Sequence, residues 1–458
     1  MPSAELINIY EEETEPLLKA LIPAERYGCK LDLSIIDSLR GEYKKDQEER
    51  EERMKAKTWP DFNPGSYPQV NKAGCKLGYA DALEDKNKAS GYCTDKARLT
   101  EIAEDEPFFR DVLDYRHTVK IMSTYLDNAE NDVDEDGRAR YSWVQLTSTG
   151  RLSCRFLHQI ERINKKRVKD GRPILRDLFI SETGYSYVYG DYSQVELRIL
   201  GLIAPEPELM RLYEEGADIH LASTAELLGL PEEPDPSDPS MSLPGAIGKW
   251  MARASDNRSA IGKPLNFGLA YGSQGQAIVD KSQWVDVDGV LHNIPIDLFN
   301  EGMARWKLRF PGIIQYHEDA PDWVRGNGGV AVDSFGRNRQ FGTRLNDGNK
   351  WARMAAEREV INNGIQGPAG AITNRTIIKV HEFLESLKKS GQLGPDEVYL
   401  VNTVHDSVIY EVKDHLTDWF SQVLKKIGER KIPQLSDYRF PMSIGVGRSW
   451  TQAELAAD

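Results

Sequence analysis

The clearest change of pattern along the chain falls between residues 185 and 203. Tyr185, Tyr187 and Tyr189 alternate with small or β-branched residues, which is typical of a short strand. From Val195 onward, apolar and polar residues interleave in a way more consistent with a helix. Asp191 therefore lies where the predicted strand ends. A carboxylate there suits either a hard metal ion or the N-cap of the helix, and this residue alone does not decide between them.

A second β-rich region contains another aspartate. Residues 398–412 form two apolar runs around His405, Asp406 and Ser407, which predicts a hairpin with Asp406 at its tip. Two aspartates brought together could hold two Mg²⁺ ions about 3.5–4 Å apart, the arrangement that clamps the attacking and leaving oxygens of a phosphoryl transfer. The two patterns together therefore favour a metal site.

The first 140 residues have mainly helical patterns. Apolar residues form one stripe at Leu17–Ile22 and start a second helix at Leu31–Leu39, which continues as a polar run from Gly41. A long charged helix of this kind is expected to project from its domain.

Two later segments carry functional groups at a spacing of four, which places them on one face of a helix. The rows are Lys263, Phe267 and Tyr271 in the first segment and Arg358, Asn362 and Gln366 in the second. Each row is also compatible with an ordinary amphipathic helix whose polar face meets solvent.

Composition indicates a soluble protein of several domains. The chain has 458 residues, 40% of them hydrophobic and 28% charged, and a prior of about 150 residues per domain gives about three domains. No window approaches the roughly 18 apolar residues of a membrane span, and the acidic N-terminus is unlike a signal peptide. We expect a cytoplasmic protein with no membrane partner. The four cysteines lack metal-like spacing and are expected to be reduced thiols.

Charge is unevenly distributed. The net charge is −14, yet residues 138–176 contain eleven Lys or Arg and two acids. A concentrated basic stripe predicts a polyanion-binding face, whereas a solvated basic loop is the simpler interpretation of Lys165–Arg167 taken alone.

Three segments resemble the motifs of family A DNA polymerases, the DNA polymerase I group that includes bacteriophage replicases. Asp191–Arg198 resembles motif A, Asp256–Gly272 resembles motif B, and Val404–Ser407 resembles motif C. Ser407 departs from the pattern, because it stands where the family usually has Glu. The resemblance begins almost at Met1, where residues such as Tyr115–Tyr125 are similar to the family's thumb.

The resemblance implies an α+β fold shaped like a right hand. The thumb would be 1–140, the first part of the palm 141–204 with motif A, the fingers 205–345 with motif B, and the second part of the palm 346–458 with motif C. The palm would be an antiparallel sheet. No room remains for an exonuclease domain, so this chain alone is not expected to proofread.

The resemblance also implies the catalytic groups. Two Mg²⁺ ions would be held by Asp191, Asp406 and the backbone carbonyl of Tyr192, while Lys263 would act on the triphosphate. The other nucleotide-binding residues would be Gln194, Glu196, His220, Arg258, Phe267 and Tyr271. Glu196 would exclude the ribose 2′-hydroxyl.

Contacts to DNA are implied for a further set of side chains. Arg151 would reach the minor groove at the primer end, where acceptors common to all correct pairs can be tested without reading sequence. The other DNA-binding residues would be Gln159, Arg358, Asn362, Gln366 and His405.

Motif B departs from the family in its first turns. The family's Arg stands four residues before the Lys, but here Ser259 occupies that position and Arg258 stands five before Lys263. On an unbroken helix this would turn Arg258 by roughly 140° from Lys263. Because Pro264 disfavours helical geometry in the preceding residue, we expect the helix to break or start anew near Gly262–Pro264. If the helix is straight, Arg253 or Lys249 could be the phosphate partner.

The sequence thus predicts a template-directed DNA polymerase that binds primer-template DNA and dNTPs. The alternatives are a single-subunit RNA polymerase, which shares the hand, and a non-catalytic DNA-binding replication accessory. The chain identifies no helicase, exonuclease or processivity partner.

Overall fold

The computed structural model describes residues 9–85, 88–103, 106–154, 160, 165–228, 261–273, 278, 283–285 and 291–457. Its centre is a four-stranded antiparallel sheet in the order β12-β3-β9-β8. The strands are β3 (Tyr185–Tyr192), β8 (Val398–Val404), β9 (Ser407–Lys413) and β12 (Met442–Gly447). The predicted strand at 185–190 and the predicted hairpin at 398–412 are both present.

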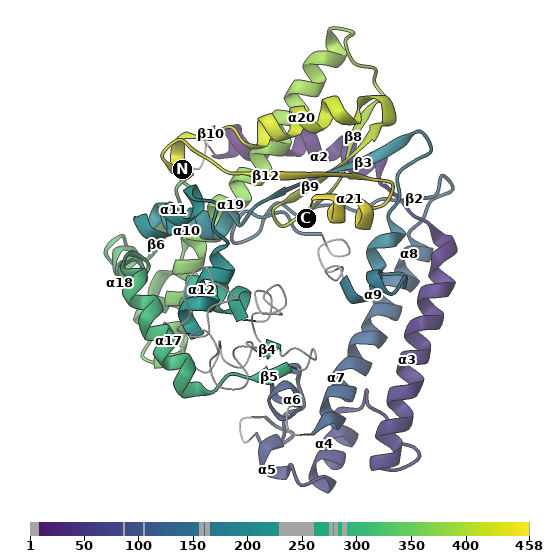
Figure 1. Ribbon diagram of the computed structural model, residues 1–458, viewed down its shortest axis with the longest axis vertical. Coiled ribbons are helices and arrows are strands. Elements are labelled where there is room, and N and C mark those ends of the chain that lie inside the picture. The colour runs from purple at the N-terminus through teal and green to yellow at the C-terminus, as the bar shows by residue number, and fades with distance from the viewer. Residues whose placement is uncertain are drawn as a thin grey trace, which may run out of the picture.

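Helices cover both faces of this sheet. Gly190 contacts α20 (Thr417–Gly428), since a Cβ at Gly190 would lie 3.0 Å from the Leu424 side chain. On the opposite face, Gly445 and Gly447 lie directly against α21 (Trp450–Ala457), where added Cβ atoms would come within 2.0 and 2.5 Å of the Ala453 backbone. Figure 1 shows α20 and α21 on the two sides of the strands. Glycine is thus required for close packing at 445 and 447, where the neighbouring atoms belong to backbone.

The N-terminal part is helical and includes a long antiparallel pair, α3 (Ile36–Lys57) and α7 (Pro107–Lys120). Figure 1 shows these helices side by side, extending away from the sheet. The other elements of this part are η1 (Tyr10–Thr14), α2 (Glu15–Tyr27), β1 (Cys29–Lys30), η2 (Leu33–Ile35), α4 (Tyr67–Lys76), α5 (Ala80–Leu83), α6 (Lys96–Ile102), η3 (Ile121–Leu126), α8 (Asp127–Asn131) and β2 (Arg138–Ala139).

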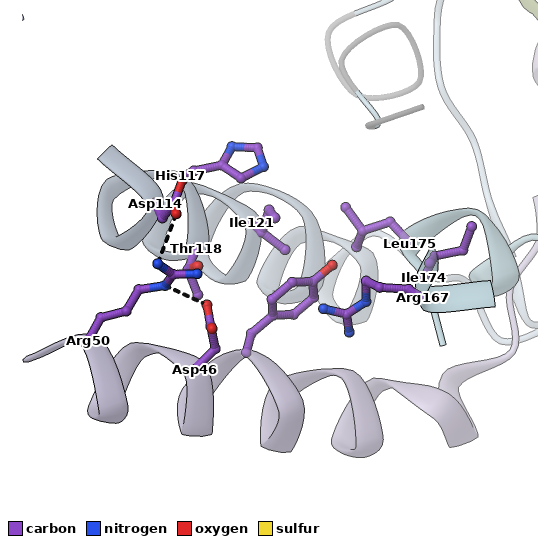
Figure 2. A pocket seen from close by; sticks show the side chains of 10 residues that line it. Asp46, Arg50, Asp114, His117, Thr118, Ile121, Arg167, Ile174 and Leu175 are labelled. Atoms are coloured by element: carbon purple, nitrogen blue, oxygen red, sulfur yellow. Dashed lines mark hydrogen bonds and ion pairs between the residues drawn. The ribbon is translucent and has the colours of Figure 1, made fainter. Parts of the chain in front are cut away.

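The polar run of α3 pairs with α7 instead of facing only solvent. Arg50 Nη1 lies 3.0 Å from Asp111 and 2.8 Å from Asp114, and its Nε lies 2.9 Å from Asp46. Figure 2 shows Arg50 between Asp46 and Asp114, at a cavity of about 220 Å³. Charges that look solvated in the sequence therefore join the two helices.

A second arm lies opposite the α3/α7 pair in Figure 1, at the left of the view, and has its own apolar core. Its elements are α10 (Val195–Ile203), α11 (Pro207–Glu214), α12 (Ile219–Leu228), α15 (Lys263–Ala270), β4 (Gln283–Val285), β5 (Leu291–Asn293), α17 (Ile296–Arg309), α18 (Pro311–Gly326), β6 (Val330–Val332), β7 (Asn338–Gln340) and η9 (Gly342–Asn346).

One helix connects this arm to the sheet. The 40-residue α19 (Lys350–Lys389) packs on α18 and α10 in the arm and on α2 and α20 near the sheet. The remaining elements are α9 (Lys165–Lys169), η5 (Leu175–Leu178), η10 (Asp414–Leu416), β10 (Lys431–Ile432), η11 (Pro433–Leu435) and β11 (Tyr438–Arg439). The fold is α+β, as predicted. Among the described helices, none carries an apolar stretch long enough to cross a bilayer.

Candidate active site

Strand register brings the two predicted metal ligands to one end of the sheet. Asp191 pairs with Ser407 in the antiparallel β3/β9 ladder, and the backbone N–H of Tyr192 donates to the carbonyl of Asp406 at 3.3 Å. Asp191 and Asp406 are both half-buried. Asp191 is not a helix cap, because β3 continues to Tyr192 and the N-cap of α10 is Gln194, with a left-handed φ of 52°.

The hairpin that carries Asp406 is closed by Ser407, the residue that departs from the family pattern. The buried Ser407 hydroxyl donates to the Val404 carbonyl at 2.9 Å, and the Thr403 hydroxyl donates to the Ser407 carbonyl at 2.9 Å. His405 is exposed at the tip, with a left-handed φ of 57°. Ser407 therefore has a structural partner inside the hairpin.

The donor set fits a hard cation. Two carboxylates and the nearby carbonyl of Tyr192 are oxygen ligands, which Mg²⁺ prefers, and Mg²⁺ usually completes its shell with waters and substrate phosphates. Among the described residues, no group of three or more His, Cys, Asp or Glu side chains gathers into a metal site. Burial, together with the Asp191 carboxylate, raises the pKa of Tyr189, so this phenol beneath the site stays protonated.

Glu196 lies at the centre of a second cluster. It is in the first turn of α10, its Oε1 pairs with Arg151, and its Oε2 accepts a hydrogen bond from the Tyr271 hydroxyl. Nearby, Gln194 Oε1 accepts from the Tyr213 hydroxyl at 3.0 Å. The structure thus joins Arg151, predicted to contact the primer end, with two predicted nucleotide-binding residues, Glu196 and Tyr271.

The helix of motif B presents the expected row. Lys263, Phe267 and Tyr271 are half-buried, and the rings of Phe267 and Tyr271 lie 6.1 Å apart. The helix α15 begins at Lys263 with Pro264 in its first turn. Ile261 and Gly262 before it are π-helical, so the helix type changes at the expected place near Gly262–Pro264. Arg258, together with the alternatives Lys249 and Arg253, lies outside the described residues.

Gly262 is needed for close packing with α12. A Cβ at this position would lie 2.2 Å from the carbonyl oxygen of His220 and 2.7 Å from Thr224 Oγ1. This close packing is a further reason for a glycine at the point where the helix changes.

His220 is packed beneath this helix. The ring is 2% exposed, lies 5.7 Å from the Phe267 ring, and has Nδ1 3.1 Å from Asn266 Nδ2 and 3.3 Å from the Gly262 carbonyl. In this conformation the ring is covered by its neighbours. Its contact with a triphosphate stays a prediction.

The second predicted row lies on α19 and is longer than the sequence suggested. Arg358, Asn362 and Gln366 are half-buried on one face, and the buried Asn362 Oδ1 has no hydrogen-bond partner among the described residues. Gly370 continues the spacing of four, and a Cβ there would lie 2.9 Å from Arg151 Cγ. Arg151 therefore extends the same row from a different segment. In the sequence, the position of Gly370 four residues after Gln366 could have indicated that the row continues.

The basic segment at 138–176 is largely ion-paired where the structure describes it, and its role as a polyanion-binding face stays a prediction. Several arginines of this segment pair with carboxylates, most of them from distant segments. The pairs include Arg138 with Glu411, Arg140 with Asp136, Arg151 with Glu196, Arg172 with Glu42, and Arg176 with Glu454. Gln159, a predicted DNA contact, lies outside the described residues, as do the side chains of 161–166.

Comparisons with known proteins agree with this arrangement. The family model described as DNA polymerase family A matches residues 34–452. The chain is 28% identical over 463 residues to DNA polymerase I of Rhizobium leguminosarum and 27% identical over 460 residues to a thermostable DNA polymerase I of Thermus filiformis. Each alignment covers 99% of this chain, but only 41% and 49% of those relatives. The chain thus spans less than half of their length.

A solved structure has the same fold. It is the POL domain of Pol1 from M. smegmatis in complex with DNA primer-template and dNTP, which superimposes with a TM-score of 0.77 at 24% identity. The match covers 98% of this chain and 71% of that one.

Proposed function

The chain belongs to DNA polymerase family A, and from that premise we propose that it adds deoxynucleotides to the 3′ end of a DNA primer under the direction of a template. The observation that carries the proposal is the β3/β9 register, which places Asp191 and Asp406 at one end of the sheet. Two carboxylates, one on β3 and one in the adjoining β8–β9 turn, are the minimum that a two-metal phosphoryl transfer requires.

Asp191 and Asp406, with the Tyr192 carbonyl, would hold two Mg²⁺ ions. Such ions, when bound, lower the pKa of the attacking hydroxyl and neutralise the pyrophosphate. The chain's own contribution is mostly positioning and fixed charge.

The nucleotide would lie between α15 and α10. Lys263, with His220 and Arg258, would neutralise the triphosphate, while the Phe267 ring would pack on the sugar. Glu196 would meet the 2′ position of that sugar, where it excludes a hydroxyl by size and leaves it without a partner.

Primer-template DNA would cross the row on α19. Arg358, Asn362, Gln366 and Arg151 form one line of hydrogen-bonding groups that would face the duplex. The mycobacterial neighbour holds DNA and a dNTP, which supports the same partners here. In this assignment 1–140 is the thumb, 205–345 the fingers, and 141–204 with 346–458 the palm.

A primer-extension gel with Mg²⁺ tests the proposal. A labelled primer on a DNA template should lengthen with dNTPs and hardly at all with rNTPs. Extension with rNTPs would favour a single-subunit RNA polymerase. Binding of the primer-template without extension by either set would favour a replication accessory.

A further inference from the structure

A buried carboxylate from the N-terminal segment holds together parts of the chain that are far apart in sequence. The Glu13 side chain, in η1, is 3% exposed. Its Oε1 accepts from Arg337 Nη2 at 2.7 Å and from Asn374 Nδ2 at 3.0 Å, and its Oε2 lies 3.5 Å from Arg375 Nε. These partners come from the loop before β7 and from α19.

Two of these partners also hold the loop before Arg151. The Asn374 amide donates to the Gly150 carbonyl at 3.0 Å. Gly150 has a φ of 70°, and a Cβ there would lie 2.3 Å from the Arg337 guanidinium, so the Arg337 group rests directly on this glycine. Glu13 therefore fixes both groups that contact Gly150.

Arg151 is also held at its side chain. Its stem lies against Gly370, which is one turn before Asn374 on α19, and its guanidinium pairs with Glu196. The backbone at Gly150, together with the bond from the Thr147 hydroxyl to the Arg151 carbonyl at 2.7 Å, sets where the Arg151 side chain begins. A shift of that backbone would move the whole side chain.

Glu13 is suited to this task because of charge. Among the described residues, Glu13 is the carboxylate that forms an ion pair with Arg337. Arg375 is different, since it also pairs with Glu12 at 3.3 Å, and the Glu12 side chain is 62% exposed. Neutralising Glu13 would weaken a mostly buried charge-assisted bond, whereas neutralising Glu12 would weaken an exposed one.

We propose that Glu13 is a positioning residue for Arg151, acting through Arg337, Asn374 and the Gly150 carbonyl, so that the N-terminal segment sets how strictly the primer terminus is tested. This inference rests on the proposed function, in which Arg151 reaches the minor groove at the primer end. A correctly paired terminus should benefit from a well-placed Arg151, and a mismatched terminus should not.

The test is single-turnover extension of matched and mismatched primer termini. Glu13→Gln keeps the shape and one acceptor but removes the charge, and it should lower the matched-to-mismatched rate ratio by about tenfold, the usual effect of one charge-assisted hydrogen bond. Glu12→Gln is the control and should change the ratio less than about twofold. Asn374→Ala, which removes the bond to Gly150 but leaves Glu13 and Arg337 paired, should also lower the ratio.

Epistasis separates positioning from general loss of stability. In an Arg151→Ala background the ratio should already be low, and Glu13→Gln should lower it no further. The inference is overturned if Glu13→Gln behaves like Glu12→Gln, or if it lowers extension equally from both termini and equally with and without Arg151. Should Glu13→Gln fail to melt cooperatively, Asn374→Ala decides by the same criteria. Failure of the proposed function is a separate outcome, in which the wild-type chain extends no primer.

Discussion

The aspartate pair and the Glu196 cluster lie close together but are held in different ways. Asp191 lies on β3, and Asp406 lies in the tight turn between β8 and β9, where its carbonyl accepts from the Tyr192 N–H of the neighbouring strand. Glu196 meets Arg151 and Tyr271 only through side-chain ends, which come from a loop and from the end of α15. The positions of the two aspartates therefore depend mainly on backbone hydrogen bonds. The Glu196 cluster depends on two side-chain contacts, each of which a single substitution can remove.

This difference suits the two tasks proposed for these groups. Metal ligands need a fixed geometry, which a strand ladder supplies without reorganisation. A group that tests an incoming sugar must exchange partners, and Glu196 can do so because neither of its contacts involves the backbone. Substitutions that remove one group at a time distinguish the aspartate pair from the Glu196 cluster.

The largest effect is expected at the backbone-held pair. Asp191→Ala or Asp406→Ala should each reduce extension by roughly a thousandfold or more, about 4 kcal/mol of barrier, since one carboxylate cannot hold two ions. Steady-state extension at saturating Mg²⁺ measures this. Asp414→Ala is the control, because that carboxylate follows the far end of β9 and pairs with Arg448. Activity above about a tenth of wild type would contradict the metal assignment.

A smaller and different change is expected at Glu196. Glu196→Ala should raise the rNTP-to-dNTP ratio of kcat/KM by about ten- to a hundredfold, following the roughly 1–3 kcal/mol of an unmade buried polar contact. Overall dNTP extension should fall far less than in the aspartate variants. Glu208→Ala on α11, which removes an ion pair with Arg309, should leave the ratio unchanged. An unchanged ratio in Glu196→Ala would place the sugar gate elsewhere.

Removal of the Tyr271 hydroxyl should change nucleotide incorporation less than removal of the Glu196 carboxylate. Tyr271→Phe removes one donor to Glu196 but keeps the ring beside Phe267, so kcat/KM for dNTPs should change by about two- to tenfold. The rNTP-to-dNTP ratio should stay within about threefold of wild type, since the carboxylate remains. Tyr213→Phe, which removes the bond to Gln194, is the matched control. A ratio shift as large as that of Glu196→Ala would mean that the hydroxyl, and not the carboxylate, is the gate.

The smallest effect on rate is expected at Ser407. Ser407→Ala removes the bond that closes the hairpin, which should lower the free energy of unfolding by about 1 kcal/mol in urea. Extension should fall by less than about fivefold, because the backbone pairing that places Asp406 is kept. A loss of rate comparable to Asp406→Ala would show that this serine takes part in catalysis.

Local pattern was enough to predict the elements that carry the candidate site. The alternation at 185–190 and the hairpin around Asp406 correspond to β3, β8 and β9, because side-chain period reports strand geometry directly. The spacing of Lys263, Phe267 and Tyr271 predicted their shared face for the same reason. These inferences depend on neighbours within a few residues.

Partners from distant segments could not be predicted. The basic charge of residues 138–176 predicts a polyanion-binding stripe. The sequence does not indicate that Arg138 pairs with Glu411 or that Arg176 pairs with Glu454. Glu13 looked like one acid among several in an acidic run, yet it is buried among cations. Ion pairing across hundreds of residues is a property of the tertiary fold, and the net charge of a segment does not contain it.

Pro368 divides the row on α19 into two parts. The helix is about 60 Å long by the usual rise per residue, and Arg358, Asn362 and Gln366 precede this proline, while Gly370 and Asn374 follow it. Pro368 has no N–H to give to the Gly364 carbonyl, so the helix bends most easily at this point. A few degrees of bending there would change the angle between the first three groups and Arg151, and so the curvature of any duplex that could touch all four at once.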